Sequence, residues 1–148
     1  MSALSEAKAL LEADATLLAT ATGGVWDIDE AGRLGLSRTT TPGAFDATGR
    51  VKPCVLLKLR DRRPFGGLAD DAGQYVSTRQ VLEVWLYEDT GYAAIDVMRQ
   101  RIYVLLHGQQ LSGTFAVQWE GDVRGARDLE LDASVERSDY AVYGKQSA

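Results

Sequence analysis

Few side chains in this sequence are of the types that carry out catalysis or bind metal ions. The 148 residues include a single histidine, His107, and a single cysteine, Cys54. Any Ser-His-Asp or Cys-His site would have to use that one imidazole, because the histidine activates the nucleophile. A zinc site needs several cysteine or histidine ligands. The sequence therefore predicts no catalytic residue, no metal site and no cofactor.

Both of these side chains have structural explanations. His107 is expected in the last turn of a helix, before Gly108, where a positive charge interacts favourably with the helix dipole. Cys54 lies in the apolar run Pro53–Leu57, where a buried small side chain is expected rather than a reactive thiol. Because one thiol cannot form a disulfide within the chain, a reducing compartment is consistent with this composition.

Carboxylate pairs and a glycine-rich segment are present, but their spacing matches no binding motif. Asp70–Asp71 and Asp27–Glu30 lack the ligand spacing of a calcium loop. Pro64–Gly67 lacks both the Gly-Lys-Ser/Thr ending of a Walker motif and the G-x-G-x-x-G spacing of a dinucleotide-binding loop. Solvated loop charge and a turn explain these segments.

Arginines and loop aromatics are the better candidates for function, and they indicate protein binding. These residue types are enriched at protein interfaces. The arginine cluster favours interprotein ion pairs or a solvated loop over phosphate contact, because Asp61 lies inside it and the chain is acidic overall. For the aromatic rings, closing the edge of the core is an equally good explanation. The predicted interface residues are Phe45, Arg60, Arg62, Arg63, Phe65, Tyr140 and Tyr143.

Length and composition are those of one globular domain, which we expect to span residues 1–148. Hydrophobic residues make up 45% of the chain and charged residues 25%, which are ordinary values. The net charge of −5 argues against nucleic-acid binding, which needs a basic surface. No apolar run approaches the ~18 residues that span a membrane, and the N-terminus lacks the pattern of a signal peptide. We therefore expect a soluble protein made in the cytoplasm.

Hydrophobic periodicity predicts an α+β fold. Helices are expected at residues 3–21, with Ser2 as N-cap and a restart at Asp14, and at 90–107, with Thr90 at its start. Long loops or hairpin arms are expected at residues 29–52 and 61–75, and a frayed tail at 146–148. Strands are expected at residues 24–28, 54–59, 75–87, 114–119 and 129–136. This order favours a single mostly antiparallel sheet with the two main helices packed on one face.

Five short phrases occur in order along the chain. The first helix contains Leu11–Leu17, and a Gly-Gly turn then leads into Gly23–Asp27. Val81–Tyr87 precedes the second helix, which ends in Leu106-His107-Gly108, and the closing strand leads to Arg137–Gly144. Together these phrases, which are spread in order over most of the chain, resemble the tail-terminator family (tail-completion or minor tail proteins) of long-tailed bacteriophages.

The resemblance implies a structural virion protein without enzymatic activity. It would form a homo-hexameric ring at the head-proximal end of the tail tube, stop tube polymerisation and join the tail to the head connector. The implied partners are further copies of itself, the tail tube protein and head-closure or connector proteins. DNA would pass through the lumen without specific binding, and acidic residues there would let it slide. The chain would occupy the host cytoplasm during assembly and the neck of the virion afterwards.

Three alternatives remain open from the sequence. A head-closure or adaptor protein of the head–tail connector has a similar size and α+β character, and its assembly partner would distinguish it. A small enzyme that uses loop carboxylates would need a buried acid with a strongly raised pKa in a concave pocket. A monomeric module that binds through a sheet edge would differ from a ring former in native mass.

Overall fold

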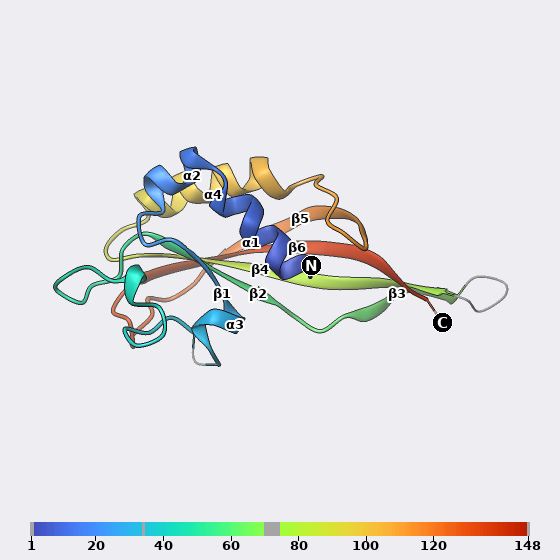
Figure 1. Ribbon diagram of the computed structural model, residues 1–148, viewed down its shortest axis with the longest axis horizontal. Coiled ribbons are helices and arrows are strands. Elements are labelled where there is room, and N and C mark those ends of the chain that lie inside the picture. Colours follow the sequence, from blue (N-terminus) through green and yellow to red (C-terminus); the bar gives the residue numbers. More distant parts are fainter. Residues whose placement is uncertain (1, 34, 70–74, 148) are drawn as a thin grey trace.

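The computed structural model describes residues 2–33, 35–69 and 75–147, and over them the chain folds into one six-stranded, mostly antiparallel sheet (Figure 1). Five strands lie in the order β1-β2-β4-β6-β5, and β3 also pairs with β4. Only β1 and β2 run parallel. The strands are β1 (Val25–Asp27), β2 (Cys54–Leu59), β3 (Arg63–Ala69), β4 (Tyr75–Glu88), β5 (Thr114–Arg124) and β6 (Ser134–Ser147). The α+β fold predicted from the sequence is confirmed.

The helices α1, α2 and α4 lie on one face of the sheet, whereas α3 and the 3-10 helix η1 contribute residues to the core on the other face (Figure 1). The helices are α1 (Ala3–Glu12), α2 (Ala15–Thr20), α3 (Ile28–Ala31), α4 (Ala93–Leu106) and the 3-10 helix η1 (Pro42–Ala44). Ser2 caps α1, as predicted, by accepting a hydrogen bond from the Ser5 amide at 3.1 Å. The predicted restart at Asp14 is confirmed and divides the segment at 3–21 into two helices, because the Asp14 carboxylate accepts from the Leu17 amide at 2.8 Å and starts α2.

The start of α4 differs from the prediction. The N-cap position belongs to Tyr92, which makes no side-chain cap, and Thr90 lies outside the helix. The carboxylate of Glu88, at the end of β4, instead accepts hydrogen bonds from the amides of Ala94 and Ile95 at 2.9 and 3.2 Å. A negative group at the positive end of a helix satisfies amides that have no partner within the helix.

The long central strands β4 and β6 pair along their whole lengths, from Tyr75 with Ser147 to Glu88 with Ser134. The predicted frayed tail is therefore wrong for residues 146–147, which continue β6, and Ala148 lies outside the described residues. On its other edge β4 pairs first with β3 and then with β2. The paired ends of β3, β4 and β6 extend beyond the helices as an arm (Figure 1).

Much of the predicted loop at 61–75 is strand β3. The prediction is wrong for Arg63–Ala69, because the proline and two glycines of this segment have low strand propensity and hide the pairing with β4. The ladder is irregular at this place, with a register shift between Pro64 and Ala69. Residues 70–74, which the same prediction covers, lie outside the described residues.

The predicted strand at 129–136 is wrong in its first half. Residues 129–132 form a turn, in which Asp128 accepts from the Leu131 amide at 2.9 Å and Asp132 takes a positive φ of 51°. The alternation of Leu129, Leu131 and Ala133 reflects no strand face, since Leu129 is 89% exposed. Turn-forming aspartates outweigh the apolar alternation here.

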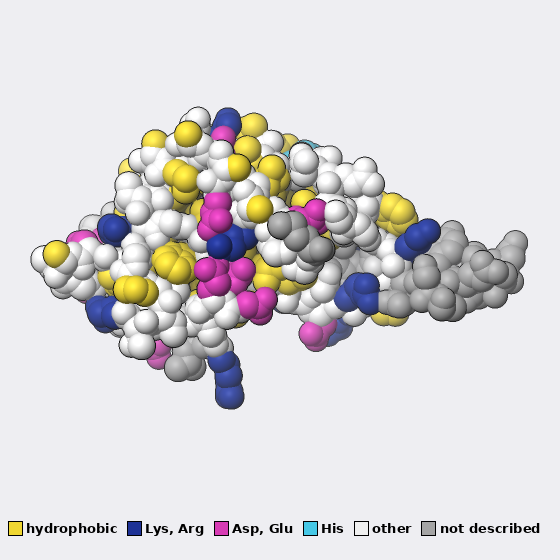
Figure 2. Space-filling view, in the orientation of Figure 1, with side chains coloured by type: hydrophobic (Ala, Val, Ile, Leu, Met, Phe, Trp, Pro, Cys, Tyr) yellow, Lys and Arg dark blue, Asp and Glu magenta, His cyan; other side chains and the backbone are white. Residues whose placement is uncertain are grey.

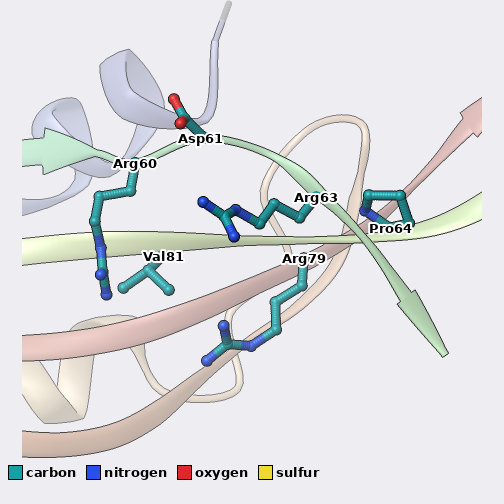
Figure 3. Close-up of a pocket in the computed structure, with 6 residues that line it drawn as sticks. All are labelled: Arg60, Asp61, Arg63, Pro64, Arg79 and Val81. Carbon is teal, nitrogen blue, oxygen red and sulfur yellow. The ribbon is translucent and has the colours of Figure 1, made fainter. Parts of the chain in front are cut away.

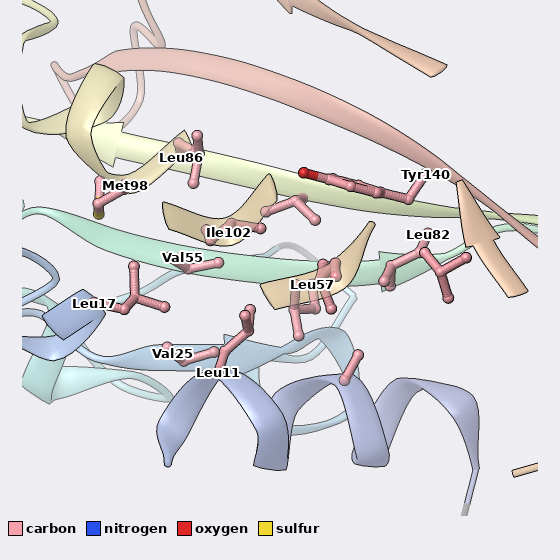
Figure 4. Packing of buried hydrophobic residues seen from close by; sticks show 14 of the residues in the cluster. Leu11, Leu17, Val25, Val55, Leu57, Leu82, Leu86, Met98, Ile102 and Tyr140 are labelled. Atoms are coloured by element: carbon pink, nitrogen blue, oxygen red, sulfur yellow. The ribbon is translucent and has the colours of Figure 1, made fainter. Parts of the chain in front are cut away.

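Two hydrophobic cores lie on opposite faces of the sheet. The larger core lies between the sheet and α1, α2 and α4, and includes Leu57, Ile102 and Tyr140 (Figure 4). The second core lies under the segment at 29–52, where Leu36 and Phe45 pack on the sheet. That segment was expected to be a loop or a hairpin arm. Apart from α3 and η1, its described residues form no regular helix or strand, and they cover the second face at one end of the sheet (Figure 1).

Candidate protein-binding surfaces

Three arginines from three neighbouring elements form a basic hollow at the base of the arm (Figure 3). Arg60 follows β2, Arg63 begins β3 and Arg79 comes from β4, and the hollow between them is about 670 Å³ in volume. Val81 also lines it, while the next residue, Leu82, belongs to the helix-side core. Since neighbouring strand residues point to opposite faces, the basic hollow lies on the face away from the helices.

Carboxylates balance two of these arginines. Arg60 Nε lies 3.0 Å from Oε2 of Glu83, and its Nη2 lies 4.0 Å from Oδ2 of Asp139. Arg79 pairs with Glu120 of β5, and the hydrogen bond raises the pKa of the guanidinium. Paired charges of this kind contribute little net attraction for a further anion.

Arg62 and Arg63 are exposed at the start of β3. Figure 2 shows basic side chains at the surface where the arm leaves the body of the molecule. Of the sequence-predicted arginine cluster, Arg60 and Arg63 line the same hollow. Arginines in such a position can form planar, two-pronged hydrogen bonds with a carboxylate of a partner.

A second concave surface, the α4–β5 groove, lies on the helix side of the sheet and has a volume of about 430 Å³. Large apolar side chains stand at it: Tyr103 is 42% exposed, Val104 65% and Trp119 44%. Arg99, Gln100, Tyr103, Val104, Trp119, Asp122 and Tyr140 line it. Exposed aromatic side chains gathered in a hollow are typical of protein-binding surfaces.

Contacts between rings hold the aromatic wall of the groove in place. Tyr103 stacks on His107 with centroids 4.9 Å apart and meets Trp119 edge-on at 6.0 Å. The Nδ1 atom of His107 accepts a hydrogen bond from the Trp119 amide at 3.1 Å. The imidazole of His107, at the C-cap of α4, thereby links the helix end to β5.

Tyr140 forms the floor of the groove, and its hydroxyl has no hydrogen-bond partner among the described residues. The residue is fully buried. Burial raises the pKa of this phenol, and the charge of Asp122 raises it further, so the hydroxyl keeps its proton at neutral pH. Asp122 uses Oδ1 to accept from Ser138 at 2.6 Å and from Trp119 Nε1 at 3.1 Å.

An ion-pair network borders the same groove. Arg99 lies 2.8 Å from Glu136 and 2.7 Å from Asp96, and Arg124 pairs with the same two carboxylates. The nearest approach of Asp122 to a cation is 3.8 Å, from its Oδ2 to Nε of Arg99. The network joins α4 to β5 and β6, and it lowers the pKa of Asp96 through the hydrogen bond from Arg99.

The structure disperses the other predicted interface residues. Phe45 is buried in the second core beneath Arg38, whose guanidinium carbon lies 5.0 Å from the ring centroid. Tyr140 is buried in the helix-side core, and Tyr143 is half-buried opposite Arg79 in the β4–β6 ladder. Phe65 lies in β3, and its side chain lies outside the described part. In the isolated chain, Phe45 and Tyr140 are therefore core residues, which is the alternative to interface contact that the sequence allowed.

Sequence reasoning missed the α4–β5 groove. Neither Trp119 nor Tyr103 is among the interface residues predicted from the sequence, because a strand and a helix each present apolar side chains to a core. One signal was available: Val97 and Val104 lie seven residues apart in α4, on a face other than the stripe of Ile95, Met98 and Ile102. A second apolar stripe on one helix indicates a second packing surface.

The described residues contain no group of three or more His, Cys, Asp or Glu side chains placed to hold a metal ion. Burial raises the pKa of the Cys54 thiol to about 12, so this group remains an unreactive thiol. No described helix has the length and apolar character needed to cross a membrane.

Neither a protein-family model nor a curated protein matches this chain. Solved structures do match, and one of them is a chain described as "Virion of native gene transfer agent (GTA) particle". That chain aligns with a TM-score of 0.62 and 15% sequence identity, over 99% of this chain and 100% of its own length. At this identity the likeness establishes a fold that the two chains share from end to end.

Proposed function

We propose that this chain is a non-enzymatic structural protein of a phage-like virion, and specifically the tail terminator. The observation that carries the proposal is the end-to-end fold match with a chain of a gene transfer agent virion. The five sequence phrases that resemble tail terminators agree with it. In this role the chain forms one domain and a homo-hexameric ring at the head-proximal end of the tail tube, in the neck of the virion.

The two concave surfaces support an assembly role. A protein that stops a growing tube must match the exposed face of the last tube ring and offer a different face to the head connector. The basic hollow and the α4–β5 groove lie on opposite faces of one sheet, so the chain can contact two neighbours at once. Of the interface residues proposed from the sequence, Arg60 and Arg63 line one of these surfaces. The net charge of −5 suits a lumen through which DNA passes without binding.

The experiment that tests this function deletes the gene for this chain and examines the particles that assemble without it. A terminator limits tube growth, so its loss should give overlong tubes without heads, seen by negative-stain microscopy. Adding the purified chain should restore tubes of normal length with a ring at one end. Particles of normal morphology without this chain would contradict the proposal.

A head-closure or adaptor protein is the second candidate, because the same fold match to a virion chain is compatible with any layer of the neck. The deletion experiment separates the two roles. Loss of an adaptor leaves tails of normal length that fail to join heads, and the purified chain would then bind the portal side instead of tubes.

A further inference from the structure

The buried hydroxyl of Tyr140 lacks a hydrogen-bond partner among the described residues, and it lines the α4–β5 groove. A folded chain seldom retains such a group, because its bond to water is lost without replacement. A partner that enters the groove can supply the missing bond. The unpaired hydroxyl is thus independent evidence, beside the exposed aromatic rings, that the groove receives a ligand.

The chemistry of the groove suits a guanidinium group. Trp119 and Tyr103 offer exposed rings, on whose faces a cation is attracted. Oδ2 of Asp122 accepts no hydrogen bond from the described residues, whereas Oδ1 accepts two. A planar arginine head could therefore lie against an aromatic ring while donating to Asp122 and to the oxygen of Tyr140.

The charge balance around the groove also favours a cation. The carboxylates of Asp96, Asp122 and Glu136 face the guanidinium groups of Arg99 and Arg124. Three negative charges against two positive charges leave one negative charge. Three further arginines on α4, β4 and β6 pair with other carboxylates, Arg101 with Asp14, Arg79 with Glu120, and Arg137 with Asp139.

Exposed arginines of the required kind lie on the opposite face of the same sheet. Arg63 is exposed and lines the basic hollow, which Val81 lines from the side away from the helices, and the exposed Arg62 precedes it. The groove opens on the helix side, where Tyr140 lies (Figure 4). The sheet therefore separates the arginines from the groove within one chain, and only a second chain can bring them together.

We infer that the Arg62–Arg63 segment of one copy docks in the α4–β5 groove of a second copy. The guanidinium of Arg63 lies against Trp119 and donates to Asp122 and to the Tyr140 oxygen. The inference deepens the proposed ring function and rests on it. Because the two surfaces differ, the contact is head-to-tail, and repeated head-to-tail contacts close into a ring when the rotation between copies permits.

Tyr140→Phe gives a test in which stability and assembly move in opposite directions. Removing the unpaired hydroxyl should leave the melting temperature of the isolated chain unchanged or higher. It should weaken self-association about threefold to tenfold, measured by sedimentation over a concentration series. Equal self-association in Tyr140→Phe and wild type would overturn the role of the hydroxyl, and with it the docking mode.

A mixing experiment tests the head-to-tail contact itself. Trp119→Ala removes the groove wall and Arg63→Glu reverses the charge of its occupant, and each should weaken self-association at least about tenfold. A mixture of the two variants retains one intact junction, so native mass spectrometry should find a dimer and nothing larger. Failure of the mixture to dimerise would overturn the contact.

Two control variants carry the same kinds of substitution outside the two surfaces, and they test whether such changes weaken self-association at any exposed position. Val123→Ala shortens an exposed apolar side chain of β5 on the face away from the groove, where its ladder partner Arg137 also lies. Arg33→Glu reverses the charge of an exposed arginine that lines neither surface. Both should associate like wild type, and circular dichroism should show every variant folded. If these controls are as defective as Trp119→Ala, the groove has no special role and the inference falls.

The outcomes separate this inference from the proposed function. A wild-type chain that forms rings while the two groove variants and Arg63→Glu form them equally well would overturn the contact and leave the function standing. A wild-type chain that stays monomeric up to its solubility limit, and on tail tubes, would overturn both.

Discussion

The carboxylate of Asp14 holds Arg101 across the interface of two helices while it also caps one of them. Its Oδ2 and Oδ1 atoms lie 2.8 and 2.7 Å from Nε and Nη2 of Arg101 in α4, and Oδ2 accepts the Leu17 amide of α2 as well. One side chain thereby sets where α2 begins and how it packs on α4. The helix pair covers the larger core, so this contact connects local sequence to tertiary structure.

Replacing Asp14 should separate its two roles. Asp14→Ala removes both the cap and the ion pair and should lower the melting temperature by about 3–6 °C. Asp14→Asn keeps an acceptor for the Leu17 amide and should lower it by less. Differential scanning calorimetry measures both changes. Equal losses in the two variants would show that the ion pair alone matters.

The same carboxylate makes stability depend on pH at acid values. The hydrogen bond from Arg101 lowers the pKa of Asp14 from 3.8 to about 2 in the folded chain. A lowered folded-state pKa gives stability that is complete above pH 3.8 and is lost as the pH falls towards 2. The pKa values of Asp96 and Asp46 are also lowered, by hydrogen bonds from Arg99 and Thr48, and act in the same direction. Chemical denaturation at several pH values should therefore show a shallower acid slope for Asp14→Asn than for wild type.

Local patterns sufficed for much of the fold. The apolar stripe of α4, the run at Cys54–Leu59 and the capping oxygen of Ser2 act over a few residues, so the sequence alone reveals them. The arm was harder to predict. Arg63–Ala69 becomes a strand only because β4 supplies hydrogen-bond partners, and a pairing of that kind is a tertiary effect that overrides low propensity.

The candidate surfaces were predictable only in part. The arginine cluster was found because its members are adjacent in sequence. The α4–β5 groove was not found, because Tyr103, Trp119 and Tyr140 come from three elements and meet only through folding. Aromatic residues are enriched at interfaces, but the sequence does not show which rings remain exposed after folding. Phe45, which was predicted at an interface, is buried.

Shortening the side chain at two positions of α4 should distinguish a residue of the core from a residue of the groove wall. Ile102 is fully buried in the helix-side core, whereas Val104, two residues later in α4, is 65% exposed. Ile102→Ala should lower the free energy of unfolding by about 2–5 kcal/mol, because it leaves a cavity as well as losing apolar contact. Val104→Ala should change it by less than about 0.5 kcal/mol. Urea denaturation of the two variants measures both values, and a large loss for Val104→Ala would contradict its exposed position.

Glu88 should prove more important than its neighbour Asp89. Glu88→Ala removes the acceptor for the amides of Ala94 and Ile95 at the start of α4 and should cost about 0.5–2 kcal/mol of stability. Asp89 pairs with the exposed Arg50, so Asp89→Ala should cost roughly 0–1 kcal/mol. Hydrogen exchange provides a second readout, since loss of the cap should speed exchange in the first turn of α4 only. If Asp89→Ala were the more destabilising change, the assignment of Glu88 as the cap would be wrong.

Gly23 and Gly125 provide a comparison of crowded and open backbone. A Cβ at Gly23 would lie 2.8 Å from Cβ of Cys54 and 3.0 Å from the Pro53 carbonyl oxygen, whereas a Cβ at Gly125 meets nothing within 4 Å. Neither glycine has a positive φ, so the comparison isolates packing from backbone strain. Gly23→Ala should destabilise the chain by about 1–3 kcal/mol, because the turn into β1 must move away from the start of β2. Gly125→Ala should be neutral or slightly stabilising, since alanine restricts the unfolded chain more than glycine does. Thermal unfolding of both variants measures the difference, and equal melting temperatures would mean that the turn before β1 adapts without cost.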